Sequence, residues 1–218
     1  MIIMKKSLGI YFLIGGLAIF VLVIIIKALS SPEPAQSPFT QAPPPLGVNA
    51  PNVNVPPYAG EAIPIIGTDP IISELPEEAV ERQKGFLAEL AATLAENQID
   101  YDGWIAVGIH KKFFNNYIGA RDAWEYAKLI EPNQPKTYLN LGNLYAYYLR
   151  DLRLAEENFL AATQRDISNS SGSYHTIANF YRDFDNREKA IHFYRKILAI
   201  DPNDQAAKVE LGRLGVIL

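Results

Sequence analysis

Small and aromatic residues in the second half of the chain recur at a spacing of 35 residues, and this constrains the fold more than any other feature. The recurring sets are Ala120, Ala155 and Ala190; Trp124, Phe159 and Tyr194; and Ala127, Ala162 and Ile197. Within one repeat the three positions stand at i, i+4 and i+7, so they share one face of a helix. A period of this size is typical of a helical-repeat solenoid, an all-α fold that usually binds other chains and rarely carries out catalysis.

A second helical pattern precedes each of these helices. It reads Trp104, Val107 and Gly108, then Tyr138, Leu141, Gly142 and Tyr145, then Tyr174, Ile177, Ala178 and Tyr181. Together with Pro132 and Pro202 after the second helices, the pattern resembles the tetratricopeptide repeat (TPR) family, whose signature is W-x2-L-G-x2-Y, then A-x3-F, then P over 34 residues. The resemblance covers residues 101–204 and implies three repeats, at 101–134, 135–169 and 170–204.

The resemblance implies a short right-handed TPR solenoid of about three helix-turn-helix repeats with a flanking helix at each end. Residues 77–100 are predicted to form the N-terminal flanking helix, which alternatively is the second helix of a degenerate repeat. Residues 205–218 are predicted to form a C-terminal capping helix, because an open solenoid end exposes apolar surface.

Three features depart from the family pattern. Lys111 stands where the first repeat should have an aromatic residue, and Ile167 stands where a proline is expected. The distance from Tyr138 to Ala155 is one residue longer than the equivalent distance in the other two repeats. We expect the extra residue to lie in the inner turn, where an insertion costs little.

The N-terminal segment is apolar. Residues 8–26 contain no charged side chain, and a helix of that length spans roughly 28 Å, close to the thickness of a bilayer core. We therefore predict a transmembrane helix at 8–29. Lys5 and Lys6 precede it, which favours a cytoplasmic N-terminus at 1–7 and an extracytoplasmic remainder, as in a single-pass protein of the plasma membrane. The alternative is a cleaved signal peptide, with a cleavage site at 28–30.

Residues 30–76 contain 12 of the 15 prolines in the chain, and we predict a disordered Pro-rich linker there. We interpret the segment as a spacer with a reach of at most roughly 140 Å; the alternative is a docking site for an aromatic groove of a partner. Its end is rich in isoleucine, at Ile63, Ile65, Ile66, Ile71 and Ile72. We expect this end to pack on the folded domain.

In TPR proteins the first helices of the repeats line a concave groove that holds a peptide. The positions that the resemblance implies for this groove are Ile105, Ile109, Lys112, Leu139, Asn143, Tyr147, His175, Asn179 and Arg182. Amides such as Asn143 and Asn179 can donate to and accept from a ligand backbone. Lys112 and Arg182 could meet a carboxylate.

Composition and motifs argue against several other functions. The net charge of −4 lacks the basic excess of a nucleic-acid binder, and the absence of cysteine excludes thiol catalysis and disulfides. The three histidines lack metal-ligand spacing, and no nucleophile or phosphate-loop motif is present. We therefore predict no enzyme activity, metal, cofactor or small-molecule substrate.

Three functions remain open. The chain is predicted to be a membrane-anchored scaffold that binds a protein or peptide partner in the concave groove. The alternatives are an envelope chaperone near the secretion exit, and a structural subunit of an envelope assembly.

Overall fold

The computed structural model describes residues 54–166 and 171–217. This part of the chain contains α-helices and no strands, which confirms the all-α prediction for these residues. The helices are α2 (Glu77–Glu96), α3 (Tyr101–Phe113), α4 (Tyr117–Ile130), α5 (Pro135–Leu144), α6 (Leu152–Arg165), α7 (Ser171–Asp183), α8 (Arg187–Ile200) and α9 (Gln205–Arg213). A 3-10 helix, η1 (Pro70–Glu74), precedes them, and a π-helical turn, η2 (Tyr145–Leu149), follows α5.

Several predictions fall outside the described residues. These are the cytoplasmic segment at 1–7, the transmembrane helix at 8–29, the linker up to residue 53, and Ile167. Among the residues that are described, no helix combines the length and the apolar character needed to cross a bilayer.

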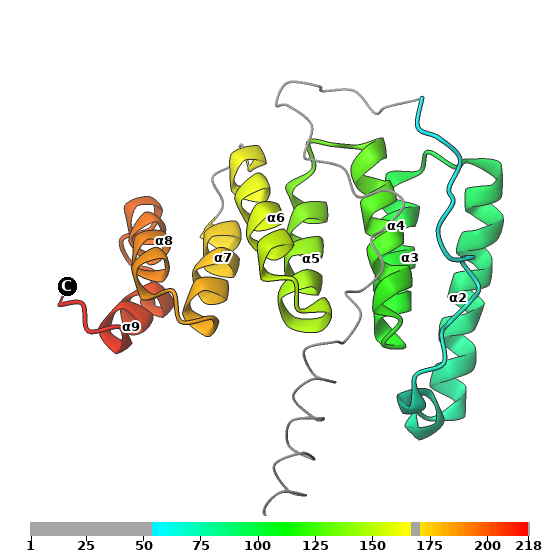
Figure 1. Ribbon diagram of the computed structural model, residues 1–218, viewed down its shortest axis with the longest axis horizontal. Coiled ribbons are helices and arrows are strands. Elements are labelled where there is room, and N and C mark those ends of the chain that lie inside the picture. Colours follow the sequence, from blue (N-terminus) through cyan, green and yellow to red (C-terminus); the bar gives the residue numbers. More distant parts are fainter. Residues whose placement is uncertain (1–53, 167–170, 218) are drawn as a thin grey trace, which may run out of the picture. The chain divides into compact units, whose positions relative to one another are not determined.

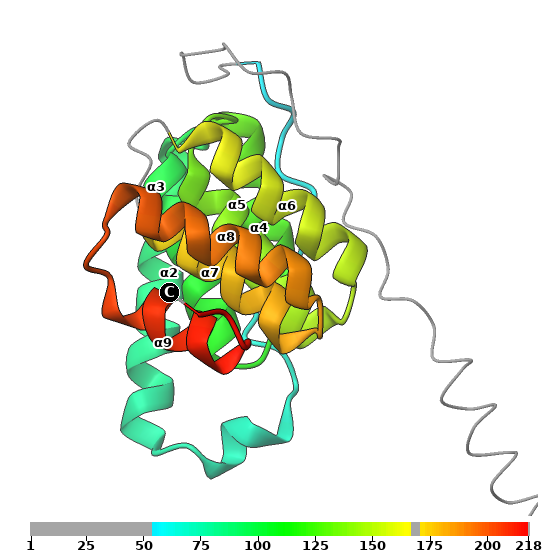
Figure 2. The same cartoon turned by 90° about the vertical axis from the view of Figure 1, so that its left-hand side faces the viewer.

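The helices pack in pairs that follow one another in chain order (Figure 1). The pairs are α3 with α4, α5 with α6 and α7 with α8, while α2 packs on α3 and α9 packs on α8. Figure 2 shows the C-terminal end of this row, where α9 lies beside α8. The arrangement is that of a helical-repeat solenoid.

The turn inside each pair is built in the same way three times, again at a spacing of 35 residues. Its first residue has a left-handed backbone conformation, and the next caps the following helix by accepting a hydrogen bond from a backbone N–H three residues on. The left-handed residues are Asn115, Arg150 and Asp185, with φ of 56°, 61° and 59°. The caps are Asn116, Asp151 and Asn186.

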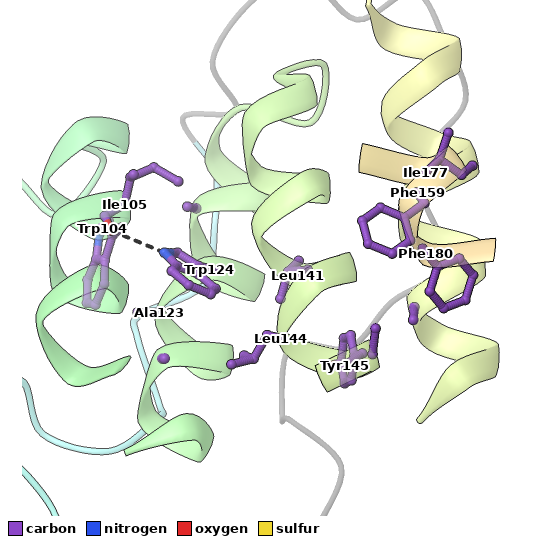
Figure 3. Close-up of a cluster of buried hydrophobic side chains, with 14 of the residues drawn as sticks. Trp104, Ile105, Ala123, Trp124, Leu141, Leu144, Tyr145, Phe159, Ile177 and Phe180 are labelled. Carbon is purple, nitrogen blue, oxygen red and sulfur yellow. Dashed lines mark hydrogen bonds between the residues drawn. The ribbon is translucent and has the colours of Figure 1, made fainter. Parts of the chain in front are cut away.

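Glycine in the first helix lets the two helices of a pair approach closely. A Cβ atom at Gly108 would lie 2.1 Å from Trp124 Nε1, and one at Gly142 would lie 2.7 Å from the ring of Phe159. The Trp124 indole donates a hydrogen bond to the carbonyl of Ile105 at 3.1 Å, drawn as a dashed line in Figure 3. The aromatic rings of α4 and α6 therefore fill the space that the missing side chains leave.

The extra residue of repeat two lies at the end of the first helix, so its predicted place in the turn is wrong. The N–H of Asp151 donates to the carbonyl of Tyr145, six residues back. The equivalent bonds, from Asn116 to Lys111 and from Asn186 to Tyr181, span five residues. The helix end widens into the π-helical turn η2, which is how α-helices often absorb an inserted residue. The turn itself keeps the geometry of the other two repeats.

Residues 54–75, called the strap below, lie against the first helix pair. The predicted linker boundary at residue 76 is therefore too late. The ring of Tyr58 lies 4.3 Å from that of Trp104, and the hydroxyl of Tyr126 donates to the carbonyl of Pro56 at 2.8 Å. The apolar side chains Ile63, Ile66 and Ile72 are half-buried against the core. Burial of this apolar surface favours the bound strap over a solvated linker.

Lys111 explains why the first repeat lacks an aromatic residue. Its side chain is fully buried, and Nζ donates to Glu61 Oε2 at 2.6 Å and to two strap carbonyls, Ala62 O at 3.0 Å and Ile65 O at 2.8 Å. Burial lowers the pKa of Lys111, and the Glu61 carboxylate opposes that shift. All three donor directions of the ammonium are thus used by the strap.

In repeats two and three, tyrosines occupy the position of Lys111, and they also donate a hydrogen bond to a glutamate. The hydroxyl of Tyr145 donates to Glu125 at 3.1 Å, and that of Tyr181 donates to Glu156 at 2.8 Å. In both cases the glutamate belongs to the second helix of the preceding repeat. The strap supplies this glutamate, Glu61, for the first repeat.

We predict that Gly108→Ala destabilises the domain by about 1–3 kcal/mol, because the added methyl group collides with the buried Trp124 ring. Gly85→Ala is the control. Gly85 lies mid-helix in α2 with no atom near its Cβ position, so the change should stabilise by up to about 1 kcal/mol. Thermal unfolding of the full chain, followed by circular dichroism, measures both. Equal shifts for the two variants would contradict this account of the pair.

Candidate functional site

Three of the predicted groove residues connect neighbouring first helices. Each lies near the end of its own helix and reaches the next first helix, or α9. The contacts are Lys112 Nζ over the ring of Tyr148 at 4.5 Å, the Tyr147 hydroxyl donating to Asp183 Oδ2 at 2.8 Å, and Arg182 Nη1 with Glu210 Oε2 at 3.3 Å. These side chains therefore hold the row of first helices together. A tyrosine hydroxyl is protonated at neutral pH, and burial, followed by the bond to Asp183, raises the pKa of Tyr147 further.

The predicted groove residues of repeat three already contact other side chains of this chain. His175 Nε2 lies 2.7 Å from Asp204 Oδ2, and Asp204 is the N-cap of α9. Asn179 Oδ1 accepts a hydrogen bond from the hydroxyl of Tyr194 at 2.6 Å. With Arg182 paired to Glu210, all three predicted residues of this repeat contact α8 or α9. Their role in the described structure is to seat the capping helix.

The predicted groove residues of repeats one and two differ in how far they are exposed to solvent. Ile105 is buried and Leu139 is half-buried against the core. Ile109, in contrast, is 50 % exposed. Asn143 is half-buried, and its Nδ2 donates to the carbonyl of Leu139 at 2.9 Å. Asn143 Oδ1 has no hydrogen-bond partner among the described residues. Ile109 and Asn143 stand at equivalent positions of α3 and α5, so this pair is the accessible part of the predicted groove.

A pocket of about 550 Å³ lies between the strap and the inner turn of repeat one. Its walls are residue 61 and residues 67–70 of the strap, residues 114–118 of the inner turn, and Leu149 at the end of η2. The volume falls in the range of small-ligand sites. Sequence reasoning missed this pocket, although Lys111 and the extra residue in repeat two both signalled that the pattern is disturbed here.

Two glycines bring the strap and the inner turn together. A Cβ atom at Gly119 would lie 2.6 Å from Glu61 Oε2, so a side chain at this position would displace that carboxylate. Gly67 has a φ of +89°, a conformation that glycine adopts without cost, and packs beside Asn116. Asn116 Nδ2 donates to Glu61 Oε2, so the helix cap also holds the strap. These contacts give the pocket two fixed walls.

Comparison with known families supports the repeat pattern. Residues 171–204 match the tetratricopeptide repeat family. The match covers α7 and α8 with the turns around them. A comparison with curated protein sequences gives no match. Within the described ranges, no group of three or more His, Cys, Asp or Glu side chains is placed to hold a metal ion.

We predict that the stability contributed by Asp204 is lost in acid. The backbone N–H of Ala207, and then His175, hold the pKa of Asp204 below its usual 3.8. Because the folded pKa is lowered, the carboxylate stabilises the fold above the unfolded value, and this contribution disappears as pH falls through the folded pKa. Asp204→Asn keeps an N-cap oxygen but has no charge to titrate.

The wild-type chain should therefore have a higher melting temperature than the Asp204→Asn variant at pH 7, and the two melting temperatures should converge near pH 2. A difference that stays constant over this range would show that the charge of Asp204 does not stabilise the seat of α9. Hydrogen exchange in α9 should increase in the variant at pH 7, because α9 is held partly by this residue.

Proposed function

We propose that this chain binds a protein or peptide partner through the exposed face of α3 and α5. The tetratricopeptide repeat at 171–204 suggests a role in protein–protein interaction. The observation that favours this face is Ile109, an apolar side chain of α3 that is 50 % exposed. Asn143 on the next first helix offers an amide oxygen that a backbone N–H of the partner can reach.

The distribution of internal contacts supports this location. In repeat three the equivalent side chains are engaged with α8 and α9, so a partner would have to displace them. At Ile109 and Asn143 a partner displaces only water. Burying the exposed part of an isoleucine contributes about 1 kcal/mol, and one amide hydrogen bond contributes a similar amount. Each is a plausible single contact within a larger interface.

We further propose that the interaction takes place at the outer face of the plasma membrane, with residues 8–29 as a transmembrane anchor. The uncharged stretch at 8–26 and the lysines before it support this orientation. Because the strap contacts the helices from residue 54 on, the free linker would begin near residue 30 and end at 53. Its reach is then at most about 75 Å, at about 3.1 Å per residue. The partner would therefore lie close to the membrane.

Crosslinking tests the proposed face. A photoreactive amino acid is placed at position 109 or 143 of the full chain in its native membrane, and at position 195 as a control. Arg195 is an exposed residue of α8. We expect a discrete protein adduct from positions 109 and 143 and none from 195. Equal labelling from all three positions would indicate collision without a binding face.

The captured partner allows a measurement of affinity. Ile109→Ala with Asn143→Ala should weaken binding by at least about tenfold, since each change removes roughly 1 kcal/mol, while the melting temperature of the domain stays the same. Asn179→Ala is the contrasting variant. It removes the acceptor of the Tyr194 hydroxyl and should lower stability, with an affinity close to that of the wild type in the folded fraction. Unchanged affinity of the double variant would exclude this face.

A further inference from the structure

The pocket beneath the strap lies where two irregular features of the chain, Lys111 and the π-helical turn, come together. Lys111 holds the strap that forms one wall, and Leu149 at the end of the π-helical turn forms another. On the side of the first helices, the ring of Tyr117 lies 4.6 Å from that of Tyr148. Tyr148 in turn lies under Lys112, a predicted groove residue. These contacts connect the pocket wall at Tyr117 to Lys112 of α3.

The charged groups that line the pocket are acidic. Glu61 and Asp69 line it, and its walls contain no lysine or arginine. The charge of Glu61 is balanced by Lys111, which leaves the charge of Asp69. Asp69 Oδ1 accepts a hydrogen bond from the N–H of Ile71 at 2.9 Å, and Oδ2 has no partner among the described residues. The pocket thus offers an acceptor that carries an uncompensated negative charge.

The charge of Asp69 acts within the pocket. The pKa of the Tyr117 phenol is raised by burial first, then by Tyr148 and by the Asp69 carboxylate. The other walls include Phe114, Ile118 and Leu149, whose side chains are apolar. An apolar wall beside a carboxylate fits a long aliphatic stem that ends in a cation, because lysine and arginine bury the stem and keep the charged end at a polar group.

We propose that this pocket binds a lysine or arginine side chain of the partner chain. The proposal rests on the proposed function, since it names the chemistry of one partner residue beside the α3–α5 face. An anionic residue would meet Asp69 and Glu61 with like charge. A neutral apolar residue would take water from Asp69 without replacing its hydrogen bonds, which is unfavourable. A cation does neither.

Small probes test the pocket separately from the groove. The full chain, labelled with ¹⁵N and kept in the detergent of its purification, is titrated with acetyl-lysine methylamide and acetyl-arginine methylamide. Acetyl-norleucine methylamide has a similar stem without the charge. We expect the cationic probes to shift the amide signals of Gly67, Asn116 and Ile118, with an affinity at least about fivefold above that of the norleucine probe, as one partly exposed ion pair gives.

Two variants assign the effect. Asp69→Asn keeps the oxygen that caps η1 but removes the charge, so the fold is retained. This variant should bind the lysine probe about fivefold more weakly than the wild type does. Asp102→Asn makes the same chemical change at an exposed position of α3 outside the pocket walls and should leave the affinity unchanged. Equal weakening by both variants would point to net charge alone and would overturn the proposal.

The remaining outcomes are also decisive. Equal shifts from norleucine and lysine probes, or no shifts at the pocket, would overturn the pocket proposal and leave the crosslinking result at positions 109 and 143 untouched. Tighter binding of spermidine than of the amino-acid probes would assign the pocket to free polyamines and overturn a partner residue. Probe binding without any crosslinked partner would contradict the proposed function and with it the partner residue, and would leave only the cation-binding pocket.

Discussion

The structure depends on the close contact between a glycine on the first helix of a pair and a large aromatic ring on the second helix. Gly108 receives Trp124 and Gly142 receives Phe159, so the two helices of a pair are fixed at short distance. The ring fills the inner side of the pair, and Trp124 also binds the α3 backbone. Because the second helices are largely used in this way, the outer positions of the first helices are left to vary. A rigid frame with variable positions is what a binding surface requires.

The helical pairs could be predicted because their signal is periodic. Apolar residues at helical spacing recur in register in all three repeats, and the glycine and the following proline each recur in two of them; each has a local physical cause. The strap could not be placed in the same way. Its main contact joins Glu61 to Lys111, 50 residues apart, and no repeat pattern predicts such a pair. The isoleucines indicated that the segment packs on the domain, but the partner residue was recognisable only as a departure from the repeat.

The groove was the less predictable part. A family resemblance gives the face of a helix but not what already covers it. His175 and Asn179 stand at groove positions, yet Asp204 and Tyr194 reach them first. Those contacts depend on the exact packing of α8 and α9, which side-chain chemistry alone does not determine. Ile109 and Asn143 are equivalent positions in sequence, and only the structure distinguishes them from their counterparts in repeat three.

The π-helical turn of repeat two has a consequence for how the repeats communicate. An inserted residue in a regular helix would rotate every later side chain by about 100°, and the core of α6 would then face the wrong way. The π-helical turn η2 accommodates the inserted residue before Arg150. Two adjacent tyrosines, Tyr147 and Tyr148, therefore occupy the region that one residue occupies in the other repeats. Tyr147 reaches forward to Asp183 of repeat three, and Tyr148 reaches back to Lys112 and Tyr117 of repeat one. A single added residue thus gives the middle repeat side-chain contacts to both of its neighbours.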